Sequence, residues 1–186
     1  MNVLVISGSR NPAGQTARAA GALAKGIEAA GAGVETVFLP AINIERCRQC
    51  RDDGWGVCID EGRCIQDDDF GPLVERLKKA DAAVFATPVY WGDLSESLRA
   101  FLDRLRRTCM HEAGKRGIKG KIALGVCVAG GGGGGAPSCT TSLQGVLSTC
   151  GFDVVDVIPA RRQNLEMKLE ILETAGAWLA GKRERS

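Results

Sequence analysis

Short apolar runs alternate with helix-like segments along this chain of 186 residues, and that alternation limits the folds it can adopt. Residues 2–7 are mostly apolar and are followed by Gly8, while residues 16–30 are rich in alanine and are followed by Gly31. A continuous apolar run is typical of a strand buried on both faces, and a glycine is typical of a helix end. The first 31 residues therefore predict one strand followed by one helix.

The same unit recurs to the end of the sequence. Strands are expected at residues 2–7, 34–39, 82–87, 122–128 and 154–158. Helices are expected at residues 16–30, 73–79, 95–107, 142–150 and 165–180. Pro72 suits a first helical turn, and Ser95 suits an N-cap. This order predicts a three-layer, doubly wound α/β fold: a five-stranded parallel sheet with helices on both faces, in a single domain over residues 1–186.

Composition excludes several classes of protein. Hydrophobic residues make up 45% of the chain and charged residues 25%, which allows an ordinary core. The net charge of +2 is too small to favour nucleic acid or an anionic membrane as a partner. The first apolar run is too short for a signal peptide, and no apolar stretch approaches the ~20 residues of a membrane helix. We therefore expect a cytoplasmic protein.

Doubly wound sheets bind ligands beyond the carboxyl ends of their strands, which directs attention to three loops. The first loop joins residues 2–7 to the first helix, and its candidate hydrogen-bond donors are Ser9, Arg10, Gln15 and Thr16. Free N–H groups at a helix N-terminus, together with such side chains, favour a phosphate. The loop is neither a dinucleotide glycine fingerprint nor a Walker A motif. An ordinary strand-to-helix turn is the alternative.

The other two loops carry aromatic residues and glycine. The second loop follows residues 82–87 and reads Thr87, Pro88, Val89, Tyr90, Trp91 and Gly92. Its aromatic rings could flank a planar ligand, or they could simply pack. The third loop is a run of six glycines at residues 130–135, which begins with Gly130, Gly131 and Gly132. Such a run favours close approach of backbone to a flat ligand, or else a flexible linker or lid.

An insertion at about residues 40–70 carries four of the eight cysteines. These are Cys47, Cys50, Cys58 and Cys64, separated by two, seven and five residues. Four thiolates on one loop can hold a 4Fe-4S cluster or a zinc ion, and free thiols or a redox-labile pair are the other readings. The remaining cysteines lie in apolar or helical contexts, which predicts small hydrophobic roles for Cys109, Cys127 and Cys150, while Cys139 is structural or near a ligand.

These motifs resemble a known family. The first loop is similar to the phosphate loop of the NADPH-dependent FMN reductase branch of the flavodoxin-like superfamily. Residues 87–92, followed by Phe101, Asp103 and Arg104 on a helix, resemble that family's flavin-ring signature. The cysteine-rich segment, which ends in three aspartates and Phe70, is similar to the iron-sulfur flavoprotein relatives.

The resemblance implies a flavodoxin-like fold with FMN as the cofactor. It implies that Ser9, Arg10, Gln15 and Thr16 hold the FMN phosphate. It implies that the isoalloxazine ring lies against Thr87, Pro88, Val89, Tyr90, Trp91, Gly130, Gly131 and Gly132. NAD(P)H would be a transient electron donor. Because members of the family usually form dimers, the resemblance also implies a homodimer or homotetramer.

Three functions remain in competition. The leading one is an FMN-dependent NAD(P)H oxidoreductase that passes electrons to a flavin, quinone, metal or iron-sulfur acceptor, either a small molecule or a protein. The alternative is an iron-sulfur flavoprotein-type electron carrier with its 4Fe-4S cluster on residues 47–64; the nearly neutral charge favours the enzyme, because carriers tend to be acidic. The third is a metal-stapled binding domain without flavin. His111 is the only histidine, which excludes a metal site built from several histidines.

Overall fold

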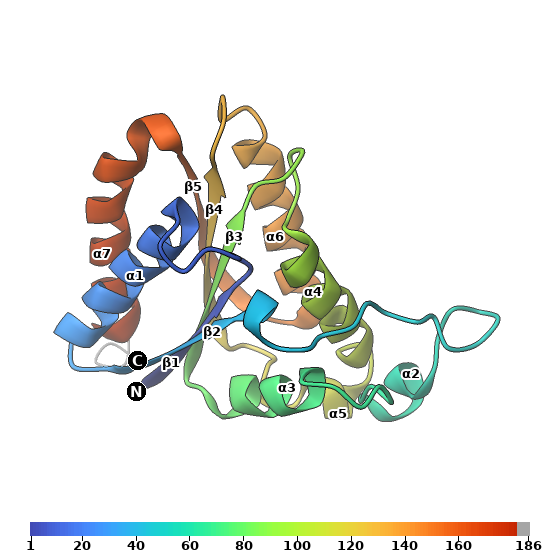
Figure 1. Cartoon of the computed structure of the whole chain (residues 1–186). Helices are drawn as coiled ribbons and strands as arrows, with labels where there is room; N and C mark the ends of the chain where they lie inside the picture. Colours follow the sequence, from blue (N-terminus) through green and yellow to red (C-terminus); the bar gives the residue numbers. More distant parts are fainter. Residues whose placement is uncertain (182–186) are drawn as a thin grey trace.

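The computed structural model, described for residues 1–181, confirms the α/β fold (Figure 1). Its one sheet has the strand order β2-β1-β3-β4-β5, and every neighbouring pair is parallel. The strands are β1 Asn2–Ser7, β2 Gly33–Phe38, β3 Ala82–Pro88, β4 Ile122–Ala129 and β5 Asp153–Arg161. The chain reverses its direction of strand addition between β1 and β3. In an open sheet of this kind, that switch point is where a ligand binds.

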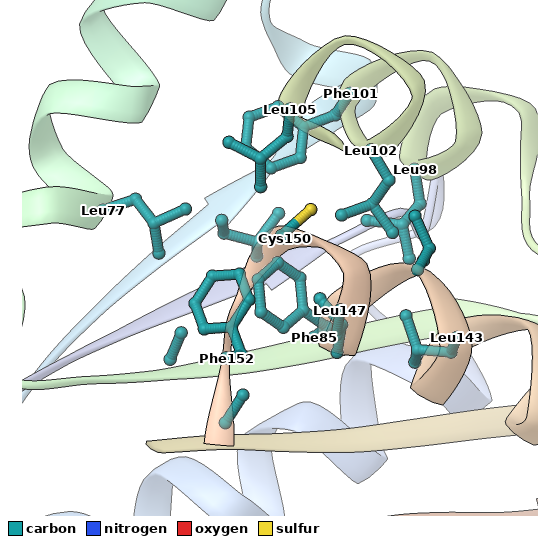
Figure 2. Packing of buried hydrophobic residues seen from close by; sticks show 14 of the residues in the cluster. Leu77, Phe85, Leu98, Phe101, Leu102, Leu105, Leu143, Leu147, Cys150 and Phe152 are labelled. Carbon is teal, nitrogen blue, oxygen red and sulfur yellow. The ribbon is translucent and has the colours of Figure 1, made fainter. Parts of the chain in front are cut away.

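Helices cover both faces of the sheet, and each face has its own apolar core. α1 (Gln15–Ala29) and α7 (Leu165–Gly181) lie on one face. The other face carries α3 (Phe70–Lys79), α4 (Glu96–Thr108) and α6 (Ala136–Cys150). Figure 2 shows the core on this second face, where the rings of Phe85 on β3 and Phe152 pack edge to face. Their ring centres lie 5.5 Å apart. All four cysteines outside the insertion are buried, as expected for small hydrophobic residues.

α1 and α7 approach each other closely because two glycines leave room for backbone. A Cβ atom at Gly26 would lie 1.9 Å from the carbonyl oxygen of Glu173. A Cβ atom at Gly176 would lie 2.2 Å from the carbonyl oxygen of Leu23. Any side chain at either position would therefore force the helices apart.

Several boundaries differ from the sequence prediction. The helix expected at residues 142–150 begins at Ala136, immediately after the glycine run, because Pro137 is compatible with a first helical turn. β5 is longer than expected, since an edge strand alternates between buried and exposed positions and its apolar pattern is weak. The short helices α2 (Val57–Glu61) and α5 (Glu112–Lys115), and the 3-10 turns Leu39–Ala41 and Arg162–Asn164, are too brief to leave a periodic pattern.

None of the helices in residues 1–181 is long and apolar enough to cross a membrane.

Candidate functional site

The three loops singled out in the sequence meet at the carboxyl edge of β1, β3 and β4. The amide of Gly8, at the end of β1, donates to the carbonyl of Ala86 at 2.8 Å. The hydroxyl of Ser97 on α4 donates to the carbonyl of Gly8 at 3.2 Å. The amide of Val89 donates to the carbonyl of Val128 at 2.9 Å. These bonds fix the loops relative to one another and to the sheet.

The N-terminus of α1 presents free backbone donors to this edge. Its N-cap residue is Gly14, no side chain caps it, and its first turn carries no acidic residue. The hydroxyl of Ser9 donates to the carbonyl of Asn11 at 3.0 Å, which shapes the loop that leads into the helix. Both Ser9 and Thr16 are buried, whereas Arg10 is exposed. An uncapped helix N-terminus without competing carboxylates is suited to bind an anion.

The side chain of Gln15 carries an unsatisfied polar atom at the same helix end. Its side-chain oxygen is buried and has no hydrogen-bond partner among residues 1–181. A buried polar atom without a partner costs about 1–3 kcal/mol, so such atoms call for an explanation. Gln15 is the first residue of α1, beside the free amides. The Gln15 oxygen needs a hydrogen-bond donor, whereas the free backbone amides beside it need an acceptor. A ligand that carries both kinds of group would satisfy this helix end.

The loop after β3 is a tight two-residue turn that displays an indole. Tyr90 and Asp93 exchange backbone hydrogen bonds of 3.0 Å in both directions. Trp91 has φ 52° and Gly92 has φ 80°, the pattern of a type I′ turn. Trp91 is fully exposed and Tyr90 is 44% exposed. A tryptophan in the left-handed region stores strain of order 1–3 kcal/mol, and such strain tends to be kept at functional sites.

Asp93 and the end of the glycine run hold this turn in place. Asp93 accepts a hydrogen bond from the amide of Leu94 at 2.8 Å and forms an ion pair with Arg99. Burial pushes the pKa of Asp93 upward, but these contacts outweigh it and lower the pKa. A Cβ atom at Gly135 would lie 2.7 Å from Cα of Gly92, so the end of the run must be glycine to fit under the turn.

The beginning of the glycine run stays open. A Cβ atom at Gly130, Gly131 or Gly132 would meet nothing within 4 Å. The run is nevertheless anchored, because Gln163 donates to the carbonyl of Gly131 at 3.2 Å and Gly133 packs against Arg161. The backbone at the beginning of the run is therefore open to solvent.

Removing the strain at Trp91 should stabilise the protein. Asparagine adopts positive φ far more readily than tryptophan, so Trp91→Asn should raise the free energy of unfolding by about 1 kcal/mol. Chemical denaturation of the purified protein measures it. Trp91→Ala is the matched control, because it removes the indole and keeps the unfavourable Cβ. If the two variants were equally stable, the strain at this turn would be refuted.

The four cysteines of the insertion line one small pocket. Arg104 and Arg107 of α4 border it as well. The sulfur of Cys64 accepts hydrogen bonds from Nη2 of Arg104 at 3.3 Å and from Nε2 of Gln66 at 3.9 Å. Within residues 1–181, no three histidine, cysteine or acidic side chains converge closely enough to hold a metal ion. In this arrangement the thiols do not fit a cluster or zinc, and metal at these cysteines stays a prediction.

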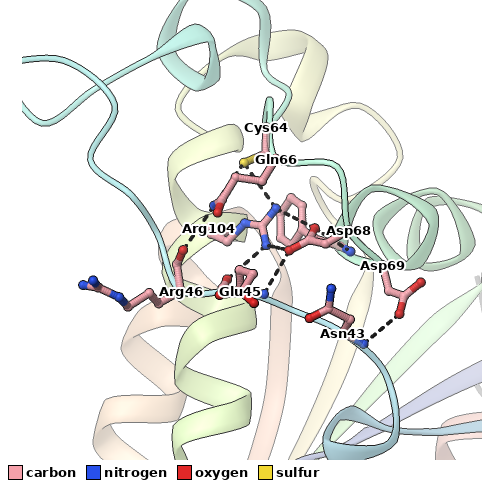
Figure 3. A network of polar contacts seen from close by, with 9 residues as sticks. Asn43, Glu45, Arg46, Cys64, Gln66, Asp68, Asp69 and Arg104 are labelled. Atoms are coloured by element: carbon pink, nitrogen blue, oxygen red, sulfur yellow. Dashed lines mark hydrogen bonds and ion pairs between the residues drawn. The ribbon is translucent and has the colours of Figure 1, made fainter.

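The buried guanidinium of Arg104 anchors the insertion to α4 (Figure 3). Arg104 is 1% exposed, contacts both carboxylate oxygens of Asp68 at 2.5 and 2.9 Å, and donates to the carbonyl of Glu45 at 3.0 Å. Its guanidinium also lies 4.2 Å from the ring centre of Phe70. Asp68 in turn accepts from the amide of Glu45 at 2.9 Å. The two ends of the insertion are thus held together on one side chain.

The charge of Asp68 is stabilised by the same contacts. Burial raises its pKa, but the hydrogen bonds from Arg104 and from the amides of Glu45 and Phe70 outweigh that effect and lower it. Sequence reasoning noted Arg104 within a flavin-ring motif and Asp68 within an acidic run, and it missed that they form one ion pair. The available signal was Asp-x-Phe at the start of α3, with Asp68 and Phe70, and Phe-x-x-Arg on α4, with Phe101 and Arg104. The rings of Phe70 and Phe101 lie 5.6 Å apart.

Comparison with known proteins identifies the family of this fold and loop set. Residues 1–160 match the NADPH-dependent FMN reductase family. The chain belongs to that family. The match includes all three loops at the sheet edge and the whole cysteine-rich insertion.

Curated relatives of this FMN reductase family member include iron-sulfur flavoproteins. One from Methanocaldococcus jannaschii is 29% identical over 131 residues, which are 70% of this chain and 65% of the relative. One from Archaeoglobus fulgidus is 30% identical over 105 residues, which are 56% of this chain and 46% of the relative. The chain therefore matches between about half and two thirds of the length of these relatives.

Solved structures agree on the fold. An NAD(P)H:quinone oxidoreductase from Methanothermobacter marburgensis superposes with a TM-score of 0.71 at 22% identity, covering 96% of each chain. An archaeal flavodoxin superposes over the whole of both chains with a TM-score of 0.65 at 16% identity. At these identities the likeness shows a flavodoxin-like fold.

Proposed function

We propose that this chain is an FMN-dependent oxidoreductase that takes electrons from NAD(P)H. It would pass them to a small-molecule or protein acceptor: a flavin, a quinone, a metal or an iron-sulfur centre. Membership of the NADPH-dependent FMN reductase family supports this function. The observation that carries it is the uncapped N-terminus of α1, whose free amides fit the phosphate end of FMN. The unpaired oxygen of Gln15 beside them can only accept a hydrogen bond, so it fits a hydroxyl donor of the ligand rather than the phosphate.

The phosphate end is proposed to lie in the loop after β1. Backbone amides of the first turn of α1 would donate hydrogen bonds to the phosphate, because no side chain caps this helix. The hydroxyls of Ser9 and Thr16 and the amide of Gln15 would complete the set. Arg10 is exposed at the rim and would add a positive charge.

The ring is proposed to lie between the turn after β3 and the glycine run. Pro88, Val89, Tyr90 and Trp91 would face one side, and the open backbone of Gly130, Gly131 and Gly132 the other. Thr87 is buried and shapes the turn, because its hydroxyl donates to the carbonyl of Pro88 at 2.9 Å and accepts from the amide of Ser95 at 3.0 Å. FMN supplies the hydride and electron chemistry, and the protein supplies binding, orientation and electrostatics.

Direct reduction by nicotinamide tests the enzymatic role. When NADPH or NADH is added without oxygen to the FMN-loaded protein, the visible flavin absorbance should bleach within seconds. It should return when a quinone is added. Dithionite serves as the control that any bound flavin can be reduced. A flavin that dithionite bleaches and neither nicotinamide does would contradict the enzyme and favour an electron carrier.

The carrier with a 4Fe-4S cluster remains the alternative function. The names of the curated relatives and the shared pocket of Cys47, Cys50, Cys58 and Cys64 favour it, whereas the present arrangement of the thiols does not. Measuring iron, zinc and acid-labile sulfide on protein purified without oxygen distinguishes a 4Fe-4S cluster from a zinc ion and from metal-free thiols.

The proposal treats the chain as a single FMN-binding domain with the cysteine-rich insertion at about residues 40–70. It also takes the working assembly to be a homodimer or homotetramer, as the family resemblance implies. Sedimentation at several protein concentrations measures that assembly.

A further inference from the structure

The cysteine loop, residues 45–68, is anchored to α4 at its ends and has accessible sulfur atoms. The ion pair of Arg104 and Asp68, and the hydrogen bond from Arg104 to the sulfur of Cys64, anchor it. Cys50 is exposed, and Cys47, Cys58 and Cys64 are half-buried, whereas the four other cysteines are buried. All eight are free thiols. Small reagents therefore reach this pocket before they reach any other cysteine.

Between Cys47 and Cys50 the backbone has an unusual conformation. Gln49 adopts φ 51°, one of two non-glycine residues with positive φ in residues 1–181. The other is Trp91, in the turn at the sheet edge. A side chain held in the left-handed region costs free energy, and here it serves to place both cysteines on the wall of one pocket.

The surroundings leave space and charge for chemistry at this pair. A Cβ atom at Gly56 would lie 3.0 Å from Cβ of Cys50 and 3.4 Å from its sulfur, so only glycine leaves Cys50 its position. Three arginines line the pocket and no carboxylate does: Arg48, Arg104 and Arg107. Asp68 balances the charge of Arg104, and the positive charge of Arg48 and Arg107 attracts anionic reagents to this pocket. Cys64 differs from the pair, because two donors already occupy its sulfur.

We propose that Cys47 and Cys50 form a reversible dithiol–disulfide site that reacts with anionic disulfides of low molecular weight, while Cys64 stays reduced as part of the anchor. The exposed sulfur of Cys50 attacks one sulfur of the reagent, which forms a mixed disulfide and releases one thiol. The sulfur of Cys47 then attacks the Cys50 sulfur and releases the second thiol. Two protein thiols are oxidised, one reagent disulfide is reduced, and both protons leave with the released thiols.

Oxidised glutathione is the probe. The protein is reduced, freed of reductant, treated with chelator and incubated without oxygen with oxidised glutathione; it is then quenched in acid, alkylated and digested with trypsin. The bond between Cys47 and Cys50 should join two short peptides, because Arg46, Arg48 and Arg51 flank them. Thiol loss at this pair should be about tenfold or more faster than at the buried cysteines. Dithiothreitol should reverse it.

Serine variants supply matched controls. Cys47→Ser should stop at a mixed disulfide between Cys50 and glutathione, and Cys50→Ser should react much more slowly because it lacks the attacking sulfur. Cys64→Ser should still form the bond between Cys47 and Cys50. The proposal is overturned if Cys64→Ser abolishes that bond, if the bond forms between other cysteines, or if no protein disulfide forms. Stoichiometric iron or zinc on the thiols of the purified protein would also overturn it. FMN retention, measured on the same samples, reports separately on the proposed function.

Discussion

Replacing Thr16 with aspartate should weaken FMN binding about 100-fold while the protein stays folded. The carboxylate would lie in the first turn of α1, where the proposed phosphate binds, and two anions would then compete for the same amides. A carboxylate at this position suits the helix dipole, so the helix itself should not suffer. Titration of the flavin-free protein with FMN, followed by flavin fluorescence, measures the change.

Two controls separate charge from other effects at Thr16. Thr16→Val keeps the shape and removes only the hydroxyl, so it should weaken FMN binding about tenfold. Riboflavin lacks the phosphate, and its affinity should be nearly the same for wild type and Thr16→Asp. A variant that lost riboflavin and FMN to the same degree would show that the phosphate does not lie at the start of α1.

Replacing Arg104 with methionine should destabilise the protein by about 3–5 kcal/mol. The substitution leaves the carboxylate of Asp68 buried without its cation, and it removes the donors to Glu45 and Cys64. For a chain of this size that loss lowers the melting temperature by about 6–20 °C. Thermal and chemical unfolding measure it. The same substitution at Arg106, which is exposed and pairs with Asp103 one turn away, should cost less than about 1 kcal/mol.

The pH dependence of this effect has a definite sign. Asp68 has a lowered pKa in the folded protein, so its ion pair stabilises the fold above the unfolded value of about 3.9 and the contribution is lost as pH falls through the lower folded pKa. The difference in stability between wild type and Arg104→Met should therefore shrink as the pH falls below about 4. A difference that grew in acid would show that Asp68 is not the partner that matters.

The strands and the long helices could be predicted because their signals are local. Residues 3–6 and 82–86 are unbroken apolar runs, which are typical of a strand in the middle of a parallel sheet. The start of α6 could not be predicted, because glycine, alanine and proline carry no periodicity. Edge strand β5 was underestimated because solvent faces part of it. Short elements such as α2 depend on tertiary contacts that no local pattern reveals.

The loops of the candidate site could be located from the sequence, since the carboxyl ends of parallel strands must share an edge. The positive φ of Trp91 could not be foreseen, because tryptophan is among the least expected residues in a type I′ turn. The role of Arg104 was hidden for another reason. Its partners Asp68 and Glu45 are 36 and 59 residues away, and the pairing of distant residues depends on the fold itself.

Flavin content after reconstitution tests the central claim most directly. The purified chain is incubated with excess FMN, desalted and denatured, and the released flavin is measured against protein concentration. A phosphate cradle at α1 with a ring site beside Trp91 predicts about one FMN per chain and markedly less riboflavin after the same treatment. A folded protein that keeps less than about a tenth of an equivalent of FMN would contradict the account.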